Sequence, residues 1–153
     1  AAASANNPVV ENNLGIVAIK KGDRKGAETH YAAAASAGPE ASYNMGAINI
    51  MNGKYSQAFS NYGSENTFNA ALAKLLNGDA AGASTTLEAS KDNNSGMGYY
   101  LKAIISARKN DASATVSNLK SAFEKDATLK AKAAEDREFL KFKDNADFKA
   151  ATM

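Results

Sequence analysis

Apolar residues are concentrated in short segments along the chain, and four of these segments end in the same way. In each one a small residue stands seven positions before a glycine or an asparagine, after which polar residues follow. The four pairs are Gly15 and Gly22, Gly46 and Gly53, Ala71 and Gly78, and Ala103 and Asn110. Glycine and asparagine readily adopt the left-handed conformation that ends a helix. The pattern therefore predicts four helices, each of which stops at one of these turn residues.

A second helix is predicted after each turn. Asp23, Asp79 and Asp111 directly follow three of the turn residues, where an aspartate can cap the next helix. Each second helix also has a small and a large residue four positions apart, so that both lie on one helical face. These pairs are Ala27 and Tyr31, Ala58 and Tyr62, Ala83 and Leu87, and Thr115 and Leu119. Because the small residue of each first helix allows close approach, we expect helical hairpins over about 9–37, 39–63, 66–89 and 95–125.

The chain changes character after the fourth hairpin. Asp126 can cap a helix that runs to about Phe142, and a short helix is expected over about 146–151. Stacked hairpins need terminal helices to cover the exposed end, so we assign residues 127–151 to a C-terminal cap. The predicted fold is all-α: a solenoid of about four antiparallel hairpins that forms a single domain over residues 8–151. Residues 1–7 are expected to be a linker or the edge of a segment of a longer chain.

Composition supports helix and excludes several classes of function. Alanine is common and valine scarce, which favours helix over sheet. A net charge of +2, from 18 basic and 16 acidic residues, is too balanced for a nucleic-acid footprint, so no nucleic-acid partner is expected. The absence of cysteine excludes disulfides and thiolate metal sites. No segment approaches the roughly 18 consecutive apolar residues of a membrane span.

The repeat resembles the tetratricopeptide (TPR) family, whose pattern is large-x-x-Leu-Gly-x-x-Tyr, then Ala-x-x-x-Phe, then Pro. The first hairpin matches at Leu14, Gly15, Ala27, Tyr31 and Pro39, and the second at Gly46, Ala58 and Tyr62. The third and fourth hairpins depart from the pattern, and the 25-residue interval between the second and third is shorter than the family period. The Phe-Asn-Ala-Ala-Leu-Ala run and the segment from Glu138 to Phe148 are also similar to TPR domains of bacterial envelope proteins.

The resemblance implies a concave groove lined by the first helix of each hairpin. The residues that it places there are Asn12, Ile16, Lys20, Tyr43, Ile50, Phe68, Leu72, Tyr100 and Arg108. The implied function is a non-catalytic interaction module that binds a hydrophobic or amphipathic segment of a polypeptide partner in a largely apolar groove. In the opposing interpretation the groove is filled by the protein's own helices. A second possibility is a structural or spacer domain of a larger bacterial envelope protein with no ligand of its own, which favours a periplasmic or outer-membrane-associated location.

Nothing in the sequence marks a catalytic or metal site. His30 is the only histidine, and one histidine cannot build the usual multi-histidine metal site or, without marked partners, a catalytic triad. The acids Glu135, Asp136 and Glu138 lie near Lys132 and Lys141 and are expected to be solvated by salt bridges. We therefore predict a protein that is not an enzyme and that needs no cofactor.

Overall fold

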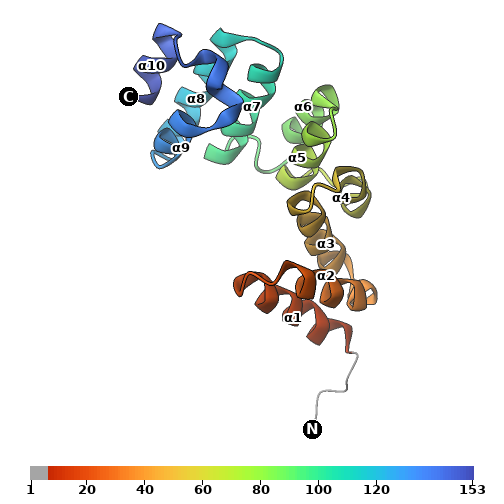
Figure 1. Ribbon diagram of the computed structural model, residues 1–153. Helices are drawn as coiled ribbons and strands as arrows, with labels where there is room; N and C mark the ends of the chain where they lie inside the picture. Colours follow the sequence, from red (N-terminus) through yellow and green to blue (C-terminus); the bar gives the residue numbers. More distant parts are fainter. Residues whose placement is uncertain (1–6) are drawn as a thin grey trace. The chain divides into compact units, whose positions relative to one another are not determined.

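The computed structural model describes residues 7–153, and throughout this range the regular structure is helical (Figure 1). The chain divides into two compact units, the first ending at Glu65 and the second covering Asn66–Met153. The single domain over 8–151 stays a prediction. Residues 1–6 of the predicted linker lie outside the described residues, whereas Asn7 is the N-cap of the first helix, where its side chain accepts from the backbone N–H of Val9.

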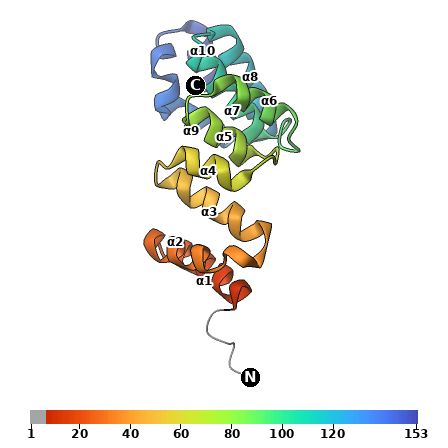
Figure 2. The same ribbon diagram turned by 90° about the vertical axis from the view of Figure 1, so that its right-hand side faces the viewer.

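The helices of both units pack mainly as neighbouring pairs, as the repeat predicts. The first unit contains α1 (Pro8–Lys20) paired with α2 (Arg24–Ala33), a 3-10 turn η1 (Ala35–Ala37), and α3 (Pro39–Met51) paired with α4 (Tyr55–Tyr62). The second contains α5 (Phe68–Leu76) paired with α6 (Ala80–Glu88), and α7 (Gly96–Arg108) paired with α8 (Ala112–Lys125). Figure 2 shows α3 and α4 side by side.

The turns within the pairs have the predicted chemistry. The backbone φ angle is 79° at Gly22, 74° at Gly53, 93° at Gly78 and 62° at Asn110. The carboxylates of Asp23, Asp79 and Asp111 each accept a hydrogen bond from the backbone N–H three residues later, at 2.8–2.9 Å. The second turn lacks this cap, because Lys54 occupies the corresponding position.

Small residues of the first helices meet large residues of the second helices in two combinations. In the first unit, a Cβ atom added to Gly46 would lie 2.6 Å from the Tyr62 ring, and one added to Gly15 would overlap the Tyr31 ring. In the second unit the equivalent positions hold alanine and leucine. These are Ala71 with Leu87 and Ala103 with Leu119, all fully buried. Glycine thus makes room for a tyrosine ring, and alanine suffices beside leucine.

The end of the chain packs on the last helix pair. Helix α9 (Leu129–Glu135), the 3-10 helix η2 (Arg137–Phe142) and α10 (Ala146–Thr152) contact α8 or α7 (Figure 1). Their buried aromatic side chains Phe139, Phe142 and Phe148 share one core cluster with Tyr100 and Leu119. The short helix predicted over about 146–151 is confirmed by α10.

The helix predicted to run from Asp126 to about Phe142 is wrong in its length. It ends at Glu135, and Asp136 is extended, with φ −71° and ψ 128°. The Asp136 carboxylate accepts from the backbone N–H of Glu138 and from the Tyr100 hydroxyl, at 3.0 and 2.8 Å. These two bonds replace helix continuation and start η2.

Candidate functional site

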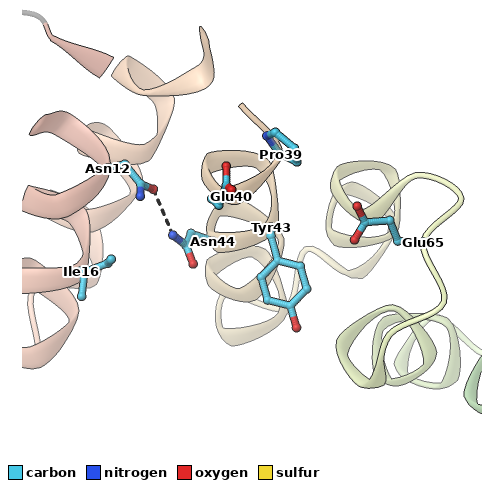
Figure 3. Close-up of a pocket in the computed structure, with 7 residues that line it drawn as sticks. All are labelled: Asn12, Ile16, Pro39, Glu40, Tyr43, Asn44 and Glu65. Carbon is cyan, nitrogen blue, oxygen red and sulfur yellow. Dashed lines mark hydrogen bonds between the residues drawn. The ribbon is translucent and has the colours of Figure 1, made fainter. Parts of the chain in front are cut away.

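The first unit has a hollow of about 550 Å³ between α1, α3 and the residue Glu65 that follows α4 (Figure 3). Asn12 and Ile16 line it from α1, and four residues of α3 line it from the other helix. The complete lining is Asn12, Ile16, Pro39, Glu40, Tyr43, Asn44 and Glu65. Three predicted groove residues, Asn12, Ile16 and Tyr43, are therefore brought together.

An amide pair lies on one side of this hollow. The Asn44 side-chain N–H donates to the Asn12 side-chain oxygen at 3.0 Å, and both residues are half-buried (Figure 3). This single bond leaves the amide nitrogen of Asn12 and the amide oxygen of Asn44 available for other bonds. One donor and one acceptor side by side match the C=O and N–H groups of an extended peptide.

The apolar part of the hollow is built around Tyr43. The Tyr43 ring packs edge-on against the Tyr62 ring, with centroids 5.2 Å apart and an interplanar angle of 66°. Tyr62 is buried, and it lies against Gly46 of the same helix as Tyr43. Ile16, on the α1 side of the hollow, is 38% exposed, so that its apolar surface is accessible (Figure 3). The contact with a buried tyrosine holds Tyr43 in place at the hollow.

The other groove residues predicted in the first unit lie elsewhere. Lys20 is exposed near the end of α1, Ile50 is half-buried in α3, and neither lines the hollow. The residues that sequence reasoning missed are Pro39, Glu40, Asn44 and Glu65. Tyr43 and Asn44 follow Glu40 by three and four residues, so that all three lie on one side of the helix. Helical periodicity could therefore have added Glu40 and Asn44 to the predicted residue Tyr43. No periodic signal marks Glu65, because it follows the end of α4.

In the second unit, Phe68, Leu72 and Tyr100 belong to the packed interior. Phe68 and Leu72 are half-buried against the core cluster that contains Leu75 and Leu87. Tyr100 is 2% exposed, and its ring packs edge-on against Phe139 with centroids 5.6 Å apart. Tyr100 is therefore a core residue and offers no surface to a partner.

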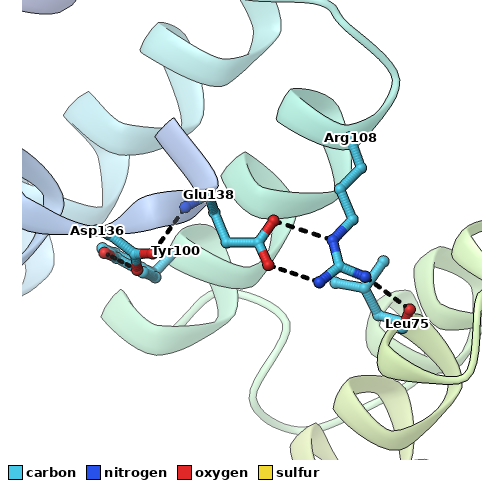
Figure 4. Close-up of polar contacts among 5 residues, drawn as sticks. All are labelled: Leu75, Tyr100, Arg108, Asp136 and Glu138. Atoms are coloured by element: carbon cyan, nitrogen blue, oxygen red, sulfur yellow. Dashed lines mark hydrogen bonds and ion pairs between the residues drawn. The ribbon is translucent and has the colours of Figure 1, made fainter. Parts of the chain in front are cut away.

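Arg108 is engaged inside the second unit. Its Nε and Nη2 atoms donate to the Glu138 carboxylate at 3.0 and 2.5 Å, and Nη1 donates to the Leu75 carbonyl at 2.9 Å (Figure 4). A guanidinium group matches a carboxylate with two parallel bonds. Of the predicted acidic cluster, Glu138 thus binds Arg108 and Asp136 binds Tyr100, rather than the nearby lysines.

His30 also has a specific partner. Its Nδ1 atom lies 2.7 Å from Glu11 Oε2, in a partly buried contact between α2 and α1. Glu28, which is closer in sequence, instead accepts from Lys54 Nζ at 2.6 Å. In the part of the chain that the structure describes, no three His, Cys, Asp or Glu side chains are grouped to hold a metal ion. The same residues contain no helix with the length and apolar character to cross a membrane.

The buried hydroxyl of Tyr100 predicts a dependence of stability on alkaline pH. Its burial, its hydrogen bond to Asp136 and the negative charge of Asp136 raise the pKa of Tyr100. The folded chain holds this proton more tightly than the unfolded chain. The contribution to the free energy of unfolding is therefore complete below about pH 10 and falls as the pH rises above it.

Tyr100→Phe is expected to lower the free energy of unfolding at neutral pH by about 1.5–3 kcal/mol, because a hydrogen bond to a charged group is lost. The variant should then lose less stability than the wild type between about pH 8 and pH 11. Some loss remains, since burial also raises the pKa of Tyr31. Urea unfolding at both pH values measures the difference, and equal losses in the two proteins would contradict the role given to Tyr100.

Comparisons of the chain with models of known protein families, with curated proteins and with solved structures found no match. The resemblance to the tetratricopeptide family therefore stays a prediction, and the candidate site stands on its own geometry.

Proposed function

We propose that this chain is a non-catalytic interaction module that binds a segment of a polypeptide partner in the hollow between α1 and α3. The observation that carries this proposal is the amide pair Asn12–Asn44 beside the accessible apolar surface of Ile16 and Tyr43. The amides can hold a peptide backbone, and the apolar surface can take a side chain. A volume of about 550 Å³ is in the range of ligand pockets.

The proposal includes the tetratricopeptide-type solenoid as its architecture. Support comes from the neighbouring helix pairs and from the contacts of Gly15 with Tyr31 and Gly46 with Tyr62, which fall on the family's motif positions. The proposed site is more polar than the largely apolar groove predicted from the sequence. Four of its seven lining residues are polar, namely Asn12, Glu40, Asn44 and Glu65. A partly polar hollow suits an extended amphipathic segment better than a purely apolar one.

Selection of random peptides displayed on phage, with the whole chain as the target, tests this function. Peptides that bind the wild type should lose at least tenfold in affinity against Tyr43→Ala, since an aromatic anchor at the centre of a site typically contributes about 2 kcal/mol. Asn44→Ala should weaken the same peptides, which gives a second variant that keeps the Tyr43–Tyr62 contact. Fluorescence polarisation with the selected peptides measures both effects.

Tyr55→Ala is the matched control, because Tyr55 belongs to the same unit but does not line the hollow. It should leave peptide affinity unchanged, while thermal unfolding verifies that each variant is folded. Selection of no peptide, or of peptides indifferent to Tyr43 and Asn44, would overturn the proposal and favour a spacer role.

A further inference from the structure

Two carboxylates of the first unit differ from the rest in having no partner of their own. Glu11 is paired with His30 at 2.7 Å, Glu28 with Lys54 at 2.6 Å, and Asp23 caps α2. For Glu40 and Glu65 the structure of residues 7–153 shows no ion pair and no side-chain hydrogen bond. Both side chains are exposed, and both line the hollow between α1 and α3. The two carboxylates of this unit that have no partner are therefore gathered at the proposed binding site.

The basic side chains of the first unit do not compensate this charge. Lys20, Lys21, Arg24 and Lys25 cluster at the end of α1 and the start of α2, and Lys54 is bound to Glu28. None of them lines the hollow. A partner segment that enters the site with a positive charge gains attraction from both carboxylates, whereas an acidic segment is repelled.

Aromatic and apolar surface lines the same hollow as the two charges. Tyr43 follows Glu40 by one helical turn, and Figure 3 shows the Glu65 carboxylate turned toward α3, which carries both. The Pro39 ring and the Ile16 side chain complete the apolar lining. A cationic side chain with a long aliphatic stem can pack its stem on such a surface while its charged end reaches a carboxylate.

We infer that the hollow selects a partner segment by an arginine side chain, which stacks on Tyr43 and pairs with Glu40 and Glu65. This inference rests on the proposed function and specifies the partner's chemistry. Arginine suits the site better than lysine, because its planar guanidinium stacks on aromatic rings and offers parallel donors to carboxylates. The amide pair Asn12–Asn44 would hold the backbone next to the arginine.

The test uses the peptides selected on the wild-type chain. Their sequences should share an arginine at one position, and replacement of this arginine by citrulline, which has nearly the same shape but no charge, should weaken binding about fivefold to tenfold at low salt. The effect should shrink as sodium chloride is raised from about 0.05 to 0.5 M, because salt screens exposed charges. Fluorescence polarisation of each peptide pair gives the ratio directly.

The double variant Glu40→Gln with Glu65→Gln should bind arginine and citrulline peptides equally. Glu135→Gln removes an exposed carboxylate of the second unit and should keep the full preference for arginine. Peptides that depend on Tyr43 and Asn44 but lack a shared arginine, or that share a lysine instead, would overturn the inference and leave the proposed function standing. Selection of no peptide at all would overturn both.

Discussion

Replacing Phe139 by alanine is expected to lower the free energy of unfolding of the second unit by about 3–5 kcal/mol. Phe139 is 1% exposed and lies between two other aromatic rings, with centroids 5.6 Å from Tyr100 and 6.0 Å from Phe148. Its removal leaves a cavity between the rings of Tyr100 on α7 and Phe148 on α10. Urea unfolding followed by circular dichroism measures the loss.

Leu140→Ala provides the matched control for this change. Leu140 is the next residue of η2, but 49% of its surface is exposed. Its replacement should cost well under about 1 kcal/mol, because little apolar surface returns to water. Similar losses for Phe139→Ala and Leu140→Ala would show that the terminal segment is not packed as described.

The second large effect is expected at the contact of Gly46 with Tyr62. A Cβ atom at position 46 would stand 2.6 Å from the Tyr62 ring, so Gly46→Ala must displace the ring or separate α3 from α4. Overpacking of this kind lowers the free energy of unfolding by about 1–3 kcal/mol, whereas the better helix propensity of alanine raises it by about 1 kcal/mol. Tyr62→Leu alone should also destabilise, because it opens space next to the glycine.

The double variant Gly46→Ala with Tyr62→Leu reproduces the combination that the second unit uses at Ala71 with Leu87 and at Ala103 with Leu119. It should therefore be more stable than the sum of the single changes allows, by about 1–2 kcal/mol. Thermal and urea unfolding of the four proteins of this cycle give the coupling. Strict additivity would mean that glycine at position 46 does not serve to accommodate the tyrosine ring.

The helix pairs were predictable because their signals are local. Gly53 and Asn110 set the ends of α3 and α7 through their own backbone conformation, and Asp79 caps α6 from the adjacent position. The contact between the small residue at position 46 and the tyrosine at position 62 is predicted by their spacing around the turn, which is the same in each hairpin. Each of these effects depends on residues within one hairpin, so no knowledge of distant contacts is needed.

Contacts between distant segments escaped prediction. At the break, Asp136 accepts a local bond from the Glu138 backbone N–H and a second bond from Tyr100. Tyr100 is 36 residues away, so its part in the break could not be predicted from the sequence near Asp136. The position of Arg108 in the fourth hairpin predicts that it lines a groove. In the structure, Arg108 instead donates to the Glu138 carboxylate and to the Leu75 carbonyl. In the hollow, Tyr43 and Asn12 followed from the repeat, whereas Glu65 comes from a connection that has no repeat register.

The engagement of Arg108 has a consequence for the order of folding. Each helix pair joins residues that are close in sequence, so its formation costs little loop entropy and is expected to be fast. The Arg108 side chain instead links a carbonyl 33 residues earlier with a carboxylate 30 residues later. These bonds can form only after α5, α7 and η2 have assembled. We therefore expect these bonds to form only after the helix pairs of the second unit, together with the other long-range contact between Tyr100 and Asp136.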